Sequence, residues 1–264
     1  MIFILLPAYN EELSLPPLLE KVRLAMEQIK ASYRIVICDD GSRDGTLAVA
    51  KRYRDQLPIE ILRHKINRGL GETIRDLIEF AVEHSSPEDV IVRMDCDDTH
   101  EPETIGRMAA RLGEDCDVVL ASRFQEGGGQ QGVSRYRGFI SAGANLFMRA
   151  VFPIRGVNEY SCGFRAYRAE ILHRAVAHYG NNFIQLKGLG FTCTLEKLLK
   201  LHLLGARFGE QAFVLQYGQK VSESKMVTSI TTMGYLVMTI CYYWPWGGWY
   251  KARLARHTRE PEAN

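Results

Sequence analysis

A run of carboxylates follows directly on an apolar stretch and is the strongest candidate for chemistry. Residues 90–94 run into Asp95, Asp97 and Asp98, and ligands of open α/β sheets bind at the carboxyl ends of strands. Asp95 and Asp97 can converge on one point, and two close carboxylates are hard to keep ionised without a cation. Because hard divalent cations prefer oxygen ligands, we predict Mg²⁺ or Mn²⁺ at Asp95 and Asp97.

Two other interpretations of this acidic segment are less well supported. A calcium-binding helical-hand loop requires glycine at its sixth position and glutamate at its twelfth. Counted from Asp95, these positions hold His100 and Gly106, which excludes that loop. An acidic turn that caps the helix expected at Pro102 stays open, although Asp98 or Thr99 alone would suffice for a cap.

A second carboxylate pair, Asp39 and Asp40, ends another apolar stretch. A carboxylate there can accept hydrogen bonds from the N–H edge of a nucleotide base, although an ordinary strand–turn–helix corner uses the same residues. Tyr9 and Glu11 follow the first apolar stretch and are expected at the same edge. The glycines of Asn67-Arg-Gly-Leu-Gly71 lack the third glycine of a dinucleotide fingerprint, so a hydride-transfer enzyme is poorly supported.

Alternating apolar and amphipathic stretches predict the elements that position these residues. Short apolar stretches separated by helical periodicity are typical of βαβ units with a largely parallel sheet. Strands are predicted at residues 2–6, 34–39, 59–63, 90–95, 117–121 and 207–217. Helices are predicted at residues 14–30, 44–54, 71–84, 102–112, 138–151 and 192–204. The glycine-rich residues 127–132 and the turn before Ile184 are expected to be mobile loops.

Composition limits the function classes. The 264 residues are 46% hydrophobic, which suffices for a buried core, and the formal charge of +2 provides no overall field to attract nucleic acid. The six cysteines are scattered without a CxxC pair and are expected to be reduced. The apolar start of the sequence stops at Pro7, too early for a typical signal peptide, so we expect a cytoplasmic protein.

The C-terminal part predicts an apolar helix beside a basic tail. Residues 226–250 contain no charged side chain, and Lys251, Arg253, Arg256 and Arg259 follow. Pro245 is expected to end the helix close to the minimum length for spanning a bilayer. We expect a helix in the plane of a membrane surface, with packing on the domain and spanning as alternatives.

Several motifs, taken in order, resemble those of family 2 glycosyltransferases, and in particular dolichol-phosphate mannosyltransferases and related polyprenyl-phosphate sugar transferases. They are Pro7-Ala-Tyr-Asn-Glu11, Asp39-Asp-Gly-Ser-Arg-Asp-Gly-Thr46, Asn67-Arg-Gly-Leu-Gly71, Asp95-Cys-Asp97, Ser122-Arg-Phe124, Ser161-Cys-Gly-Phe-Arg-Ala-Tyr167 and Ser222-Glu-Ser-Lys-Met226. The resemblance implies a GT-A fold over residues 1–225, with a nucleotide-binding half (1–122) and an acceptor half (123–225).

The resemblance also implies roles for individual residues. Donor contacts are expected from Pro7, Tyr9, Glu11, Asp39, Asp40, Asp95, Cys96, Arg123 and Lys220. Catalytic roles are expected for Asp97, Arg123, Lys225 and Glu159. The sequence departs from the family at Thr99, where glutamine is common, at Glu159, near a usual aspartate, and at Gln219, which replaces a phosphate-binding arginine. Lys220, beside it, could compensate.

The expected reaction is an inverting, metal-dependent sugar transfer from a UDP- or GDP-sugar to a polyprenyl phosphate at a membrane. A phosphate acceptor is already ionised, whereas a hydroxyl acceptor needs a carboxylate base, for which Glu159 and Asp98 are the candidates. A soluble glycosyltransferase acting on a sugar, peptide or small-molecule hydroxyl is the main alternative. A non-catalytic nucleotide-binding protein and a sugar-nucleotide pyrophosphorylase are minor ones. The sequence does not indicate the sugar or the oligomeric state.

Overall fold

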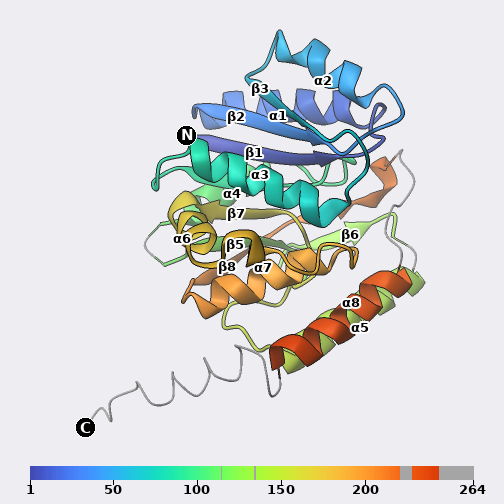
Figure 1. Ribbon diagram of the computed structural model, residues 1–264, viewed down its shortest axis with the longest axis vertical. Helices are drawn as coiled ribbons and strands as arrows, with labels where there is room; N and C mark the ends of the chain where they lie inside the picture. Colours follow the sequence, from blue (N-terminus) through green and yellow to red (C-terminus); the bar gives the residue numbers. More distant parts are fainter. Residues whose placement is uncertain (114, 134, 221–227, 244–264) are drawn as a thin grey trace.

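A seven-stranded sheet organises the chain (Figure 1). The computed structural model describes residues 1–113, 115–133, 135–220 and 228–243. The strands, in their order across the sheet, are β3 (Ile59–Arg63), β2 (Tyr33–Asp39), β1 (Ile2–Ala8), β4 (Val90–Arg93), β7 (Arg165–Arg168), β5 (Val118–Ser122) and β8 (Phe208–Ala212). All of them run parallel except β7, which confirms the predicted α/β fold with a mostly parallel sheet.

Alternation along the buried strands gives the sheet two core layers, as the pleat requires. On β1, Phe3 and Leu5 face a layer packed with α3 (Leu70–His84), α6 (Ala169–Tyr179) and α7 (Thr192–Leu203). Ile4 and Leu6 face the opposite layer, with α1 (Leu15–Ile29), α2 (Thr46–Arg54) and α4 (Thr104–Arg111). The predicted crossover helices are therefore present, with ends that shift by one or two residues.

The antiparallel strand β7 and helix α6 were not predicted. Ala166 of β7 pairs with Val92 on one side and Val119 on the other, so β7 separates β4 from β5. Four residues with an arginine at each end carry too weak a pattern to identify as a strand. The insertion brings residues 161–165 to the carboxyl edge of the neighbouring parallel strands.

The predicted strand at 207–217 divides in two. After β8 the chain turns at Phe213 and continues as β9 (Val214–Gln216), which pairs in parallel with β6 (Gly129–Gln131). The glycine-rich stretch expected to be a mobile loop thus contains a short strand. A 3₁₀ turn, η2 (Tyr217–Gln219), follows β9 and leads to Lys220. A second 3₁₀ turn, η1 (Gly180–Phe183), follows α6.

The predicted apolar segment forms α8 (Thr228–Tyr243), which contacts α7, while α5 (Arg135–Val151) follows β6. A Cβ atom on Gly234 would lie 2.0 Å from Oγ1 of Thr192, so α8 approaches α7 closely. Tyr242 donates a hydrogen bond from its hydroxyl to Glu196 of α7 at 2.6 Å. Over the described ranges, no helix is long and apolar enough to cross a membrane. Lys225, predicted to have a catalytic role, and the basic tail lie outside the described residues.

Candidate active site

The loops after β1 and β2 are joined by hydrogen bonds at the carboxyl edge of the sheet. The Asn10 N–H donates to Oγ of Ser42 at 3.0 Å, and Oδ1 of Asn10 accepts from the Arg43 N–H at 2.8 Å. Pro7 is a buried residue of β1, and Tyr9 is half-buried just beyond it. Glu11, 6% exposed, accepts a hydrogen bond from Ser14 at 2.8 Å. The residues predicted to contact a nucleoside therefore line two linked loops.

Asp39 and Asp40 are both buried but differ in their contacts. Asp39 accepts from the Ser42 N–H at 3.1 Å. Asp40 accepts from the backbone N–H groups of Arg68 (2.8 Å) and Gly69 (2.9 Å) and from the His64 ring at 2.6 Å. Asp40 therefore holds the 67–71 loop in place, and the predicted base contact falls more naturally to Asp39.

Asp95 lies just past the end of β4 and is held from two sides. Nη2 of Arg93 lies 2.5 Å from its Oδ1. Its backbone N–H donates to Nδ1 of His100 at 3.1 Å, and Nε2 of His100 lies 3.6 Å from its Oδ2. Burial lowers the pKa of His100 despite the nearby carboxylates, and its ring stacks on Phe164 at 5.1 Å. A neutral imidazole that accepts at Nδ1 carries its proton on Nε2, the nitrogen that faces the Asp95 carboxylate at 3.6 Å.

Arg93 lies beneath Asp95 and was not predicted as a site residue. It is 1% exposed, and a Cβ on Gly163 would lie only 1.4 Å from its Nη1. Its Nε and Nη1 are buried and make no hydrogen bond within the described part of the chain. The sequence did carry a signal, since Arg93 is a charge inside an otherwise apolar strand, two positions before Asp95. Such a side chain is buried only when it has a partner.

Asp97 is paired with a residue far away in the sequence. Its Oδ1 accepts from Oγ1 of Thr99 at 2.7 Å, and its Oδ2 forms an ion pair with Nζ of Lys220. Burial alone would raise the pKa of Asp97, but the ammonium of Lys220 holds it below its usual value. The same pair raises the pKa of Lys220 although burial opposes the rise. Both groups are therefore charged at neutral pH.

The two residues that flank Asp97 point elsewhere. Cys96 is 3% exposed and packs in the core layer of α1 and α4, so only its backbone is available to a ligand. Asp98 has a left-handed backbone (φ 59°) and accepts from Nζ of Lys21 at 2.9 Å. Burial raises the pKa of Asp98, although Lys21 opposes the rise.

Asp95 and Asp97 fit a divalent cation that shares its ligands with a substrate. Within the part of the chain that the structure describes, no three or more His, Cys, Asp or Glu side chains form a complete metal cage. Mg²⁺ sites that act on phosphates commonly use one or two carboxylates together with substrate oxygens. Two carboxylates at one strand end satisfy that requirement.

On the other side of β7, Arg123 follows β5 and meets Glu159. Nε of Arg123 lies 2.7 Å from Oε2 of Glu159, and its Nη2 lies 3.0 Å from Oε1. Nη2 also donates to Oγ of Ser161 at 2.9 Å. Segment 161–163 therefore connects the carboxylates after β4 with the Arg123–Glu159 pair. Ser161 contacts Arg123, and Gly163 packs against Arg93, which holds Asp95.

Glu159 is fully buried and its carboxylate is saturated with donors. Besides Arg123, it accepts from the backbone N–H groups of Ser161 and Cys162, both at 3.1 Å. Burial would raise the pKa of Glu159, but Arg123 holds it below the usual value. The backbone N–H of Glu159 in turn donates to Glu210 at 2.6 Å. This geometry suits a residue that orients Arg123 better than it suits a general base.

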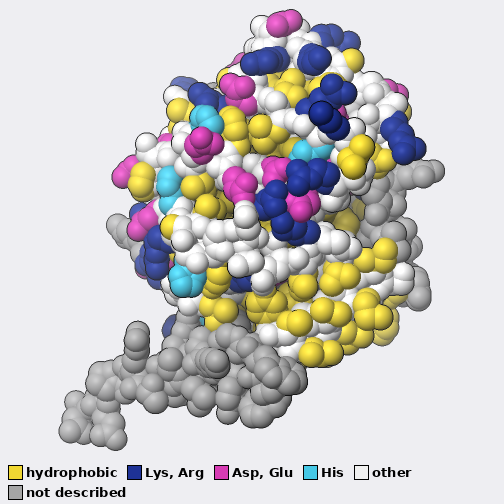
Figure 2. Space-filling model, viewed as in Figure 1, with side chains coloured by type: hydrophobic (Ala, Val, Ile, Leu, Met, Phe, Trp, Pro, Cys, Tyr) yellow, Lys and Arg dark blue, Asp and Glu magenta, His cyan; other side chains and the backbone are white. Residues whose placement is uncertain are grey.

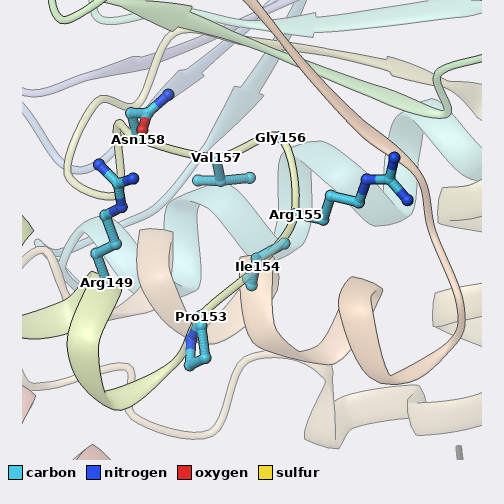
Figure 3. A pocket seen from close by; sticks show the side chains of 7 residues that line it. All are labelled: Arg149, Pro153, Ile154, Arg155, Gly156, Val157 and Asn158. Carbon is cyan, nitrogen blue, oxygen red and sulfur yellow. The ribbon is translucent and has the colours of Figure 1, made fainter.

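A cavity of about 450 Å³ lies beyond the C-terminal end of α5 (Figure 3). It is lined by Arg149, Pro153, Ile154, Arg155, Gly156, Val157 and Asn158. The close-up shows the guanidinium groups of Arg149 and Arg155 directed away from each other, so they do not converge on one ligand. None of its lining residues belongs to the site described above.

Comparison with known proteins gives a consistent picture. The sequence profile described as "Glycosyl transferase family 2" matches residues 3–175. A dolichol-phosphate mannosyltransferase of Pyrococcus furiosus is 30% identical over 198 residues, which are 75% of this chain and 52% of that protein. A polyprenol monophosphomannose synthase of Mycolicibacterium smegmatis is 29% identical over 173 residues, 65% of this chain and 63% of that protein. The chain thus spans about half to two thirds of the length of these relatives.

Solved structures share the fold at low identity. The glucosyl-3-phosphoglycerate synthase of Mycobacterium tuberculosis, in complex with Mn²⁺, UDP and phosphoglyceric acid, superposes with a TM-score of 0.58 at 16% identity, covering 91% of this chain and 77% of that one. A mannosyltransferase of Pyrobaculum calidifontis, in complex with GDP-Man and Mn²⁺, gives a TM-score of 0.56 at 14% identity over 100% of this chain and 65% of that one. The GT-A-like fold implied by the sequence motifs is confirmed. The profile match over most of the chain shows that the protein is an enzyme of glycosyltransferase family 2.

Proposed function

We propose that the enzyme transfers a sugar from a UDP- or GDP-sugar to a polyprenyl phosphate, with inversion at the anomeric carbon and with Mg²⁺ or Mn²⁺. The observation that carries the choice of acceptor is the state of Glu159. Its carboxylate is buried and accepts hydrogen bonds from Arg123, Ser161 and Cys162. An acceptor that is already ionised needs no base, and a lipid phosphate meets this condition.

Different parts of the site would bind the nucleoside, the divalent cation and the reacting phosphates. The linked loops after β1 and β2 would hold the base and ribose through Tyr9, Glu11 and Asp39. Asp95 and Asp97 would hold the divalent cation, which would supply positive charge to the departing nucleoside diphosphate. Arg123, oriented by Glu159, would add fixed positive charge near the reacting phosphates.

The surface beside Arg123 supports a lipid acceptor. Ser141 of α5 lies 3.4 Å from Nη2 of Arg123, and Asn145 of α5 donates to Ser161 at 3.2 Å. The other side of α5 exposes apolar residues, with Phe139 80% exposed. Figure 2 shows the apolar patch over α5 and α8. Its members are Phe139, Ile140, Leu146 and Phe147 on α5, and Ile230, Met233, Leu236 and Ile240 on α8.

Exposed apolar surface of this kind is typical of a membrane or protein contact. A phosphate bound at Arg123 would therefore sit one helix away from a surface suited to acyl chains. The relatives point the same way: besides the dolichol-phosphate mannosyltransferase and the polyprenol monophosphomannose synthase, they include an undecaprenyl-phosphate 4-deoxy-4-formamido-L-arabinose transferase of Pseudomonas aeruginosa. We include attachment to the cytoplasmic face of a membrane, and a phosphate contact from Lys225, in this proposal.

A hydroxyl acceptor is the second candidate. The observation that favours it is Asp98, whose raised pKa suits a proton acceptor better than an ordinary aspartate. Its carboxylate is already paired with Lys21 of α1 at 2.9 Å, however.

A labelled-sugar assay tests the proposal. The purified protein is incubated with Mn²⁺, UDP- and GDP-sugars, and undecaprenyl or dolichyl phosphate in detergent, and the organic phase is extracted. We expect label in the lipid phase with one donor, loss of that label in Asp97→Asn, and normal activity in Asp55→Asn, whose side chain is exposed. Label recovered only on water-soluble hydroxyl acceptors, or an anomer of retained configuration, would contradict the proposal.

A further inference from the structure

The two motif carboxylates have cationic partners of different character. Asp95 pairs with Arg93, which is 1% exposed and enclosed beneath Gly163. Asp97 pairs with Lys220, whose side chain is 13% exposed. Arg93 belongs to a central strand, whereas Lys220 follows a short 3₁₀ turn. Arg93 is therefore a permanent partner, and Lys220 can leave.

The segment that carries Lys220 is attached to the carboxylate loop independently of the ion pair. The Gln216 N–H donates to the Thr99 carbonyl at 3.0 Å. Nζ of Lys21 lies 2.6 Å from Oε1 of Gln219. With its backbone held, Lys220 can move its ammonium by side-chain rotation alone, since lysine has a flexible four-carbon stem.

We propose that Lys220 is an exchangeable counterion of Asp97: it pairs with this carboxylate in the metal-free enzyme, releases it when a divalent cation binds, and then pairs with the donor diphosphate. The inference rests on the proposed role of Asp97 as a metal ligand.

Electrostatic repulsion between Lys220 and the divalent cation is the reason for the exchange. An ammonium and a divalent cation repel each other and compete for Oδ2, because the other oxygen of Asp97 already accepts from Thr99. In the proposed reaction the donor diphosphate binds beside Asp97 and provides the new anionic partner for Lys220. The same lysine therefore weakens metal binding before the donor arrives and strengthens donor binding afterwards.

Direct measurement of Mn²⁺ binding tests this proposal without turnover. The loss of the free-Mn²⁺ electron paramagnetic resonance signal is titrated at pH 7.5 in wild type, Lys220→Met, Lys220→Gln, Lys51→Met and Asp97→Asn, each checked for folding by circular dichroism. Lys51→Met is the matched control, since Lys51 is an exposed residue of α2 and its removal changes the net charge equally.

Without nucleotide, both Lys220 variants should bind Mn²⁺ about fivefold to tenfold more tightly than wild type, while Lys51→Met stays within about twofold. With Mn²⁺ saturating, the Lys220 variants should bind nucleoside diphosphate about fivefold more weakly. Unchanged or weaker Mn²⁺ binding in both Lys220 variants overturns the exchange. Binding that survives in Asp97→Asn instead contradicts the proposed metal site, so the two failures can be told apart.

Discussion

Replacing Gly163 with alanine places a methyl group 1.4 Å from Nη1 of Arg93. Ordinary contact between such atoms needs about 3.5 Å, so the guanidinium must retreat by about 2 Å. Arg93 is 1% exposed, so its guanidinium is enclosed by protein and cannot retreat into solvent. The retreat must therefore break its contact with Asp95, which is now 2.5 Å long.

The expected cost combines two effects. Forcing extra volume into a packed interior costs about 1–3 kcal/mol. Separating a buried ion pair costs about 3–5 kcal/mol when one charge is left uncompensated, and somewhat less here because the Asp95 side chain is 27% exposed. We expect the free energy of unfolding of Gly163→Ala to fall by about 3–4 kcal/mol, and Mn²⁺ binding to weaken because Asp95 loses its orientation.

Urea unfolding followed by circular dichroism measures the change, with Gly188→Ala as control. No atom lies within 4 Å of a Cβ at Gly188, so that variant should change stability by less than about 0.5 kcal/mol. The decisive measurement is the double variant Gly163→Ala/Arg93→Met. Methionine is shorter and more flexible than arginine, so it can move away from the methyl group. Gly163→Ala should therefore lower the free energy of unfolding by less than about 1 kcal/mol when Arg93→Met is also present. An equal cost of Gly163→Ala with and without Arg93 would refute the reasoning.

Three further predictions concern buried charges and the attachment of α8. Burial lowers the pKa of Lys197 to about 7, from an ordinary 10.5, so the folded state loses this proton before the unfolded state does. The free energy of unfolding of the wild type should therefore rise between about pH 7 and pH 10.5. Lys197→Met should be more stable than wild type at pH 7 by about 1–3 kcal/mol. Urea titrations of this variant at increasing pH should lack the part of the rise that comes from Lys197. Glu159→Gln leaves Arg123 without its anionic partner and should lower the unfolding free energy by about 3 kcal/mol and kcat at least about tenfold, whereas unchanged values would show that the pair is unimportant. Tyr242→Phe removes a 2.6 Å hydrogen bond between α8 and α7 and should cost about 1 kcal/mol and speed amide exchange in α8; Tyr243→Phe, altered at an exposed ring, should not.

The sequence by itself determined the parallel part of the sheet and the position of the carboxylates along it. Residues 59–63 were predicted with both ends correct, and β1, β2 and β5 to within two residues. Strands and amphipathic helices are local patterns with periods of two and 3.6 residues, so they can be read without a partner. The motif residues Asp95 and Asp97 could be assigned to a strand end for the same reason.

Only the tertiary structure decided what these side chains contact. Lys220 meets Asp97 across 123 residues of sequence, and Glu159 meets Arg123 across 36. The unpredicted β7 places Gly163 against Arg93 and thereby sets the surroundings of Asp95. Ion pairs and close packing depend on distances of a few ångströms between segments remote in sequence, and no local pattern encodes them. That is why a pair of carboxylates could be predicted as a metal site, whereas the cations already paired with them could not.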